Sequence, residues 1–330
     1  MPLLWVGLQA SEALARDPAR DPVSWTVTSE NDSPWSLMWN NAYRDEYYTN
    51  GVRLSRRQDL SGHADGLLPR FVRSLGMEQA EQLQLAVSQT MYTPIEIWET
   101  TIPASVHPYA GHLFISGGLS ATREHLLGSL ELLGGWTGPP ALAEPAQKQV
   151  HVMFNGDEPM GWDEQVQAEP TFGTSLTLAA HELVPARDSG VELRAVPHTT
   201  LTLATTDLAA QGGFTLGFGT RGDVPALRPE QARFGHGGVD TRLRGDSKVG
   251  AAVFGVMSWR YQAHDMFLGG GTFSQIPSPE LIPWVHESAI GVRVRVFGTQ
   301  LLMMNNIQQK TYTTQEREHI YGTMAVSQEF

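Results

Sequence analysis

Residues 323–330 read TMAVSQEF, and this stretch ends the chain on Phe330. Its larger apolar side chains before the end, Met324 and Val326, are two residues apart. Successive side chains of a β-strand point to opposite sides, so this spacing puts both on one face. The stretch therefore predicts a strand with one apolar face.

The same two-residue period recurs along the chain and is the dominant pattern of the sequence. It is found in residues 25–29, 48–56, 83–87, 113–119, 126–133, 172–180, 191–206, 214–218, 251–261, 290–297 and 323–330. We interpret these as about ten to twelve strands with the length that spans a membrane, roughly 9–11 residues each. Bacterial barrels have an even number of strands, so we expect about twelve.

No run of apolar residues approaches the ~18 that a transmembrane helix needs. Alternating strands are then compatible with a soluble β-sandwich, which buries its apolar face, or a transmembrane barrel, which turns that face outward. An amphipathic last strand that ends on Phe330 resembles the assembly signal of outer-membrane proteins and favours the barrel. We expect an all-β, antiparallel transmembrane β-barrel of about twelve strands, located in the bacterial outer membrane.

Composition excludes several other classes. The formal net charge is -12, which argues against nucleic-acid binding, where a basic face is the usual signature. The chain has no cysteine, so it has neither disulfides nor thiolate metal sites. We expect a monomer.

The N-terminal residues suggest a partial export signal. Residues 2–10 form a short apolar run, and residues 12–15 resemble a small-residue cleavage site before Arg16. The basic region that normally precedes such a run is missing. We therefore assign residues 1–22 to a partial signal peptide or a disordered N-terminus, and residues 23–330 to the barrel.

Two regions interrupt the alternation. Residues 141–151 are rich in Ala, Leu, Gln and Lys and predict a short helix, with Pro145 near its first turn. Residues 222–248 are polar and rich in Arg and Gly, and predict a long loop. Long loops of barrels usually lie on the extracellular side, so we expect this one there.

Three clusters of polar residues are candidates for chemistry: residues 30–32, residues 45–51, and His151 with Glu158. Taken singly, the first two are typical of turns. Together they fit ester hydrolysis, in which a histidine takes a proton from water and a hard cation polarises the carbonyl. Asp32 and Glu158 are suitable oxygen donors for such a cation. The chain lacks a Gly-x-Ser-x-Gly elbow and closely spaced histidines for zinc.

An ordered series of short motifs resembles the lipid A 3'-O-deacylase family of outer-membrane barrels. The motifs lie at residues 30–32, 47–55, 92–94, 108–111, 138–139, 150–151, 158–165, 169–170, 265–268 and 315–330. The resemblance implies a twelve-stranded barrel with its active site near the outer leaflet, between the wall and a short helix. It also implies removal of the 3'-linked acyloxyacyl chain of lipid A, with Ca²⁺ as cofactor.

The resemblance implies a role for each matching residue. His151 would be the general base, and Glu158 would orient it or support the metal, with Asp157 as an alternative. Asp32 would be the main side-chain ligand of calcium, and main-chain carbonyls would complete the shell. Asn31 and Thr49 would be polar residues next to the reacting groups.

The sequence also departs from the family pattern. Val106 and His107 stand where the family often has an Asp-Arg pair, so a basic residue for lipid A phosphate is missing there. Arg53, Arg56 and Arg57 could bind phosphate or form a solvated strand end. A non-catalytic barrel, either a channel or a structural protein that keeps the family scaffold, is the alternative function.

Overall fold

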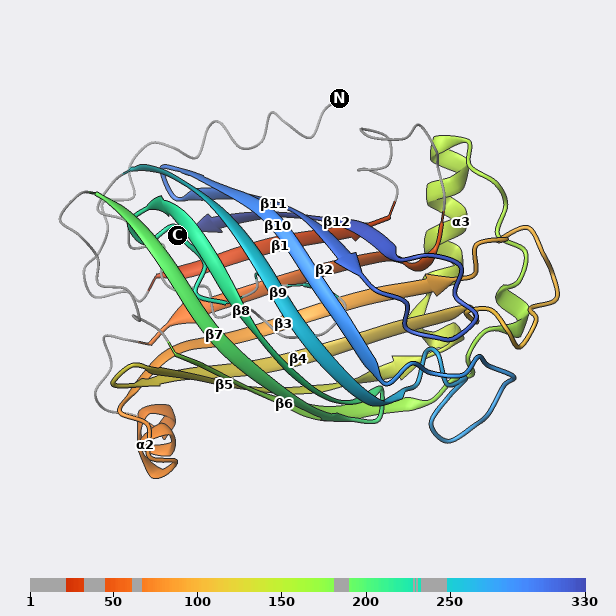
Figure 1. Cartoon of the computed structure of the whole chain (residues 1–330), viewed down its shortest axis with the longest axis horizontal. Helices are drawn as coiled ribbons and strands as arrows, with labels where there is room; N and C mark the ends of the chain where they lie inside the picture. The colour runs from red at the N-terminus through yellow and green to blue at the C-terminus, as the bar shows by residue number, and fades with distance from the viewer. Residues whose placement is uncertain are drawn as a thin grey trace.

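The computed structural model describes residues 22–32, 45–60, 67–180, 190–227, 229, 231–232 and 248–330. Their strands form one closed antiparallel barrel in which each strand pairs with its neighbours in sequence and β1 pairs with β12 (Figure 1). The predicted barrel and its twelve strands are confirmed, and a two-sheet sandwich is excluded because the sheet closes on itself. The prediction for residues 1–22 lies almost entirely outside the described residues. In the described part, no helix is both long and apolar enough to cross a membrane.

The strands and helices have the following bounds. The strands are β1 Val23–Asn31, β2 Tyr47–Asp59, β3 Gln79–Thr93, β4 Ala110–Arg123, β5 Leu126–Thr137, β6 Pro170–Ala180, β7 Val191–Ala204, β8 Asp207–Thr220, β9 Val249–Asp265, β10 Trp284–Val296, β11 Thr299–Gln308 and β12 His319–Glu329. The helices are α2 Leu67–Ser74, α3 Ala143–Phe154 and the 3₁₀ turns η1 Pro139–Ala141 and η2 Trp162–Glu164. The predicted short helix is α3, with Pro145 in its first turn as expected.

Strand β11 was absent from the predicted set for a physical reason. It follows β10 after a two-residue turn in which Phe297 and Gly298 both have positive φ. Its centre, residues 301–304, is apolar on both faces, so its sequence does not alternate. The inward residues Leu302 and Met304 pack inside the barrel in an apolar cluster with β9, β10 and β12. Because the inner face of β11 is also apolar here, the alternation of polar and apolar residues that marks a membrane strand is absent from its sequence.

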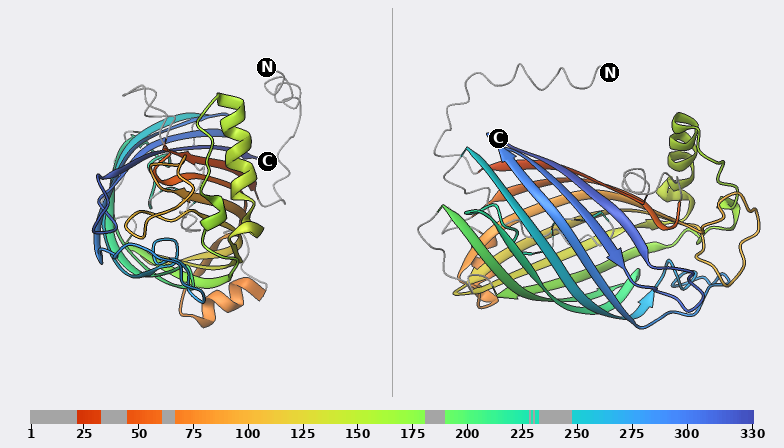
Figure 2. Two further views of the ribbon diagram at one scale, coloured as in Figure 1. Left: turned by 90° about the vertical axis from the view of Figure 1, so that its right-hand side faces the viewer. Right: turned by 45° about the horizontal axis from the view of Figure 1, so that its top comes forward.

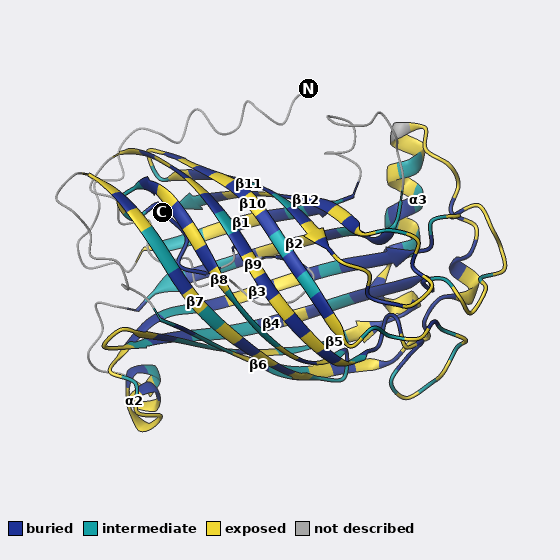
Figure 3. Cartoon of the chain, in the orientation of Figure 1, coloured by how far each residue is buried: buried dark blue, intermediate teal, exposed yellow. Residues whose placement is uncertain are grey.

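The outer face of the barrel carries a belt of exposed apolar side chains. Strand register aligns Val27 of β1 with Leu54 of β2, then with Val87 of β3 and Ile115 of β4. All four side chains are exposed, while the residues between them in each strand point inward. Figure 3 shows the resulting alternation along the strands. We refer to this row and the apolar residues beside it as the outer belt.

The two ends of the barrel differ. One end carries α3, η2 and the connection between β9 and β10, and the other carries α2 and the start of β1 (Figures 1 and 2). We call the first the α3 end and the second the α2 end. The connections at the α2 end include two tight turns, after β4 and after β10.

The connection after β8 enters the barrel. It begins at the α2 end, where the carboxylate of Asp223 accepts hydrogen bonds from Arg295 at 2.7 and 3.0 Å. Further along, the side-chain amide of Gln231 donates to the Tyr321 hydroxyl at 3.0 Å, and the main-chain N–H of Ala232 donates to Glu30 at 3.0 Å. We expected a long polar loop on the extracellular side, whereas the described part of this loop runs inside the barrel. Buried apolar residues and inward-facing polar partners draw its described part into the lumen.

Candidate active site

Helix α3 packs on the outside of the barrel wall at the α3 end. Gly111 of β4 allows this approach, because a Cβ there would lie 2.6 Å from the Cβ of Ala143. The side-chain amide of Gln89 on β3 donates to the Ala141 carbonyl at 2.7 Å. Met91 of β3 is buried against Ala143 and Trp162. Gly111 and Met91 lie on the same faces of their strands as the exposed Ile115 and Val87, so α3 covers the continuation of the outer belt.

His151 lies on α3 between two oxygen atoms. Its Nε2 is 2.7 Å from an Asp45 carboxylate oxygen, and its Nδ1 contacts the Asp157 carbonyl. Gly156 packs against the ring, since a Cβ there would lie 3.0 Å from Nδ1. Both partners accept hydrogen bonds, so this arrangement fits the doubly protonated imidazolium. The Asp45 carboxylate and the Asp157 carbonyl together fix the orientation of the ring.

Asp45 is held by a second pair of residues. Gln147, one helical turn before His151, donates its amide to the Asp45 carboxylate at 2.6 Å. The Gln147 oxygen accepts the indole N–H of the buried Trp162 at 2.8 Å. An indole only donates and a carboxylate only accepts, so the Gln147 amide has one orientation that satisfies both. The chain Trp162–Gln147–Asp45–His151 therefore positions the imidazole through directional bonds.

The electrostatics of this pair set the protonation of the histidine. The hydrogen bond to the Asp45 carboxylate raises the pKa of His151 above its ordinary value, and the Asp157 carbonyl adds to the effect. Partial burial of the ring acts in the opposite direction. The neutral ring that a general base requires is therefore reached at a higher pH than for an ordinary histidine.

Asp32 follows β1 and is buried. One of its carboxylate oxygens accepts the main-chain N–H of Glu46 at 2.5 Å, and its own N–H donates to the Thr49 carbonyl at 3.3 Å. Burial, and then repulsion by the Asp45 carboxylate, raise the pKa of Asp32 well above its ordinary value. Glu46 is in turn held by Arg317, whose Nε lies 3.0 Å from its carboxylate.

The structure brings some of the predicted residues together and leaves others apart. Asp32 and Thr49 are joined through the main chain, and Asp32 is electrostatically coupled to the partner of His151. The Thr49 hydroxyl is buried and bonds to that of Thr93 at 2.7 Å. Asn31, paired with Asn50, lies on the outward face of β1. Glu158 is exposed, and its segment reaches the histidine ring through the main chain of Asp157.

The arginines that were candidates for phosphate binding are placed otherwise. Arg53 is fully buried in the lumen, 3.1 Å from Glu131 and 3.1 Å from the Ser88 hydroxyl. Arg57 also points inward, and Arg56 lies near Gln58 on the outer side. His107, at the departure from the family pattern, is buried and stacked on Tyr92. The buried side chains of Arg53, Arg57 and His107 therefore serve the barrel itself.

A cation would fit beside Asp32. A desolvated carboxylate with other carboxylates near it has an excess of negative charge, which a hard cation with oxygen ligands would offset. In the part of the chain that the structure describes, no three His, Asp or Glu side chains are grouped as a metal site. Asp32 would then share the ion with main-chain carbonyls, as the family resemblance implied.

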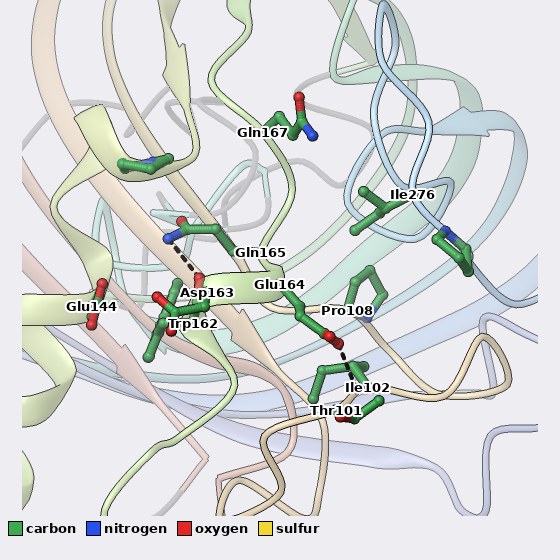
Figure 4. A pocket seen from close by; sticks show the side chains of 12 residues that line it. Thr101, Ile102, Pro108, Glu144, Trp162, Asp163, Glu164, Gln165, Gln167 and Ile276 are labelled. Atoms are coloured by element: carbon green, nitrogen blue, oxygen red, sulfur yellow. Dashed lines mark hydrogen bonds between the residues drawn. The ribbon is translucent and has the colours of Figure 1, made fainter.

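A cavity of about 590 Å³ adjoins Trp162 on its other side, between η2, Ile102 and the connection that holds Ile276 (Figure 4). The main-chain N–H of Ile102 donates to Glu164 at 2.7 Å and closes one edge of it. The residues that line this cavity do not include His151. It therefore lies apart from the histidine.

Sequence reasoning missed Asp45 and Gln147 as site residues. Asp45 belongs to the second polar cluster, but nothing in the sequence pairs it with a residue more than a hundred positions away. Gln147 had a usable signal, because it precedes His151 by four residues and so shares its helix face.

Comparisons with known proteins point to one family of outer-membrane proteins. The model of the family described as "Outer membrane protein LpxR" matches residues 3–330. The solved structure of LpxR from Salmonella typhimurium superposes with a TM-score of 0.77 at 16% identity, covering 93% of this chain and 100% of that one. The translocator domain of the autotransporter NalP from Neisseria meningitidis gives a TM-score of 0.38 at 9% identity, over 95% and 89% of the two chains. A search of curated protein sequences found no match.

Proposed function

The chain belongs to the outer membrane protein LpxR family, and from this premise we propose that it is a calcium-dependent lipid A deacylase with His151 as its general base. The family resemblance inferred from the motifs is confirmed, and the protein is an outer-membrane β-barrel. The observation that carries the proposal is the placement of His151. Its ring is held by Asp45 on the outer wall, beside the buried carboxylate of Asp32.

The proposed reaction hydrolyses the ester at the 3' position of lipid A. His151 Nδ1 takes a proton from water as the water oxygen attacks the ester carbonyl carbon. The bond between this carbon and the 3' oxygen then breaks, and the proton passes from His151 to the departing alkoxide. The products are the free acyloxyacyl acid and a 3' hydroxyl. Bound calcium would supply Lewis-acid stabilisation of the carbonyl oxygen.

Individual side chains have distinct roles in this proposal. Asp45 keeps the ring in the tautomer that carries its hydrogen on Nε2 and stabilises the imidazolium. Asp32 would hold the cation. Asn31 lies on the outward face near the end of β1, where a polar headgroup would come. Thr49 fixes the chain beside Asp32, and Glu158 remains a candidate for supporting the metal.

The alternative of a channel is disfavoured by the lumen. The described part of the connection after β8 runs from Asp223 to Ala232 inside the barrel. Inward-facing charged groups are bonded across the interior, as Arg53 is to Glu131. These contacts fill the space that a channel would need to keep open.

The test is the mass spectrum of lipid A from cells that express the protein. We expect the loss of the 3'-linked acyloxyacyl group with the wild-type chain, and intact lipid A with His151→Ala. Purified protein should give the same product from lipid A in detergent with calcium, and none after chelation. Unchanged lipid A despite abundant folded barrel would contradict the proposal.

A further inference from the structure

The C-terminal half of α3 presents a ridge of apolar side chains that nothing in the described structure covers. Val152 is 80% exposed and Met153 is 67% exposed, and Val150 beside them is also exposed. The N-terminal half of the helix is packed against the protein through the buried Ala143 and Gln147. Exposed apolar residues gathered on one short helix mark a surface that meets a partner. We refer to Val150, Val152 and Met153 as the α3 ridge.

The position of α3 identifies that partner. The helix lies outside the wall and covers Met91 and Gly111, which share the outward faces of β3 and β4 with Val87 and Ile115. One row of outward residues therefore lies under α3, and the exposed outer belt continues directly below it along the same strands. In Figure 2 the helix lies beside the wall of the first strands. Outside this wall the belt is in contact with lipid.

The charge pattern of α3 is that of a helix at a membrane interface. Its first half carries Glu144 and Lys148, which form a partly exposed ion pair at 2.7 Å. Its second half carries the apolar ridge. Helices that lie in the interface place apolar side chains among acyl chains and keep charged ones at headgroup level.

We infer that the α3 ridge inserts into the acyl-chain layer of the outer leaflet and docks α3 on the membrane. His151 lies within the ridge, between Val150 and Val152 in sequence, so docking would hold the histidine ring at the level where acyl esters lie. Only the placement of the histidine ring at the level of the acyl esters rests on the proposed function. The insertion itself is a property of the folded barrel in lipid.

The absence of cysteine allows a direct test, since a single introduced cysteine takes a label at one site. Val152→Cys in the full-length chain is labelled with the fluorophore NBD and placed in phosphatidylcholine–phosphatidylglycerol vesicles. The vesicles carry nitroxide groups on their acyl chains. Ile115→Cys marks the outer belt, and Thr313→Cys marks an exposed connection at the α3 end.

We expect nitroxide to quench the Val152 label to within about twofold of the Ile115 label, with a blue-shifted emission, because both would lie among acyl chains. The Thr313 label should be quenched by aqueous iodide instead. A Val152 label that behaves like the Thr313 label would overturn the inference. Self-quenching that disappears on dilution with unlabelled protein would also overturn it, by showing a second copy on the ridge.

A second measurement links the ridge to turnover. Met153→Asp should lower the rate on lipid A in vesicles about tenfold or more and leave the rate on a dispersed short-chain ester unchanged, since only the first needs the docked helix. Equal rates of Met153→Asp and wild-type chain on lipid A in vesicles would count against docking. Absence of any hydrolysis by the wild-type chain, with the Val152 label still in the acyl layer, would contradict the proposed function and leave the docking inference standing.

Discussion

Two buried carboxylates, Glu30 and Asp32, lie two residues apart at the end of β1 and have opposite surroundings. Glu30 faces the lumen and accepts hydrogen bonds from the Tyr48 hydroxyl at 2.5 Å, the Thr323 hydroxyl at 2.9 Å and the main-chain N–H of Ala232 at 3.0 Å. Asp32 accepts the main-chain N–H of Glu46, and the neighbour that most raises its pKa by charge is another acid, Asp45. One carboxylate sits among donors and the other beside like charge.

The different surroundings of the two carboxylates indicate different roles, one in stabilising the fold and the other in binding a cation. A buried carboxylate with three donors stabilises the fold, because both its oxygen atoms and the buried donors around it are hydrogen-bonded. A buried carboxylate that is repelled by another one destabilises the isolated fold unless a cation binds. The lumen of this barrel is of the first kind and the outer site of the second. The predictions below test this division.

The largest effect is expected for His151→Ala. Loss of a general base lowers the rate of hydrolysis by roughly a hundredfold to ten-thousandfold. The lumen contacts are untouched, so the variant should still show the gel shift on heating that marks a closed barrel. Lipid A mass spectra and a detergent assay measure the rate. His125→Ala, an exposed histidine at the α2 end, is the matched control and should retain full activity. Comparable activity of the two variants would refute the role of His151.

Asp32→Asn and Glu30→Gln should change the stability of the calcium-free protein in opposite directions. Asp32→Asn removes the proposed cation ligand and should lower activity about a hundredfold, by analogy with losses at other metal-supporting residues. It should also raise the unfolding midpoint in denaturant when calcium is chelated at neutral pH. The sign follows because the folded-state pKa of Asp32 is raised, so its ionised form opposes folding above the ordinary aspartate pKa. That penalty should fade as the pH falls.

Glu30→Gln should instead lower the unfolding midpoint with or without calcium. A glutamine keeps one accepting oxygen and turns an amide toward a former donor, which costs about 1–3 kcal/mol. The activity of the variant per folded molecule should stay within about threefold of wild type, because Glu30 faces the lumen and not the outer site. Stabilisation by Glu30→Gln, or destabilisation of the calcium-free protein by Asp32→Asn, would contradict the comparison.

Asp45→Asn should move the pH profile. Because the Asp45 carboxylate raises the pKa of His151, the acidic limb of the activity profile should lie above the ordinary histidine pKa in the wild-type chain. The asparagine variant should shift this limb to lower pH and lower the maximum rate about tenfold, since the ring loses the group that orients it. Rates from pH 5 to 9 at saturating calcium would measure both changes. An unshifted limb would mean that another group sets the histidine pKa.

The sequence predicted the barrel well and the site only partly. Alternation depends on local side-chain spacing, so strands such as β3 and β12 are visible in short stretches of sequence. Strand β11 was missed because Leu302 and Met304 face an apolar patch of the lumen. The Asp45–His151 contact joins residues from two distant connections. It forms because β2, β3 and β4 are paired side by side and α3 packs on the outer face of β3 and β4. Local patterns do not encode such a contact.

The course of the connection after β8 could not be predicted from the sequence for a related reason. Its polar, glycine-rich sequence is typical of exposed loops, yet its described residues are mostly buried. Gln231 and Ala232 are bonded to inward-facing side chains of strands that lie far away in sequence. A polar segment can be buried where the lumen supplies its hydrogen-bond partners.

The smallest effect is expected for Glu158→Gln. Glu158 is exposed, and the contact of its segment with the histidine ring comes from the Asp157 carbonyl, which the substitution leaves in place. Activity at saturating calcium should stay within about twofold of wild type, as for exposed positions away from a network. The half-saturating calcium concentration should rise if Glu158 supports the metal. A loss of activity as large as that of Asp45→Asn would mean that the Glu158 carboxylate replaces that of Asp45 beside the His151 ring when substrate binds.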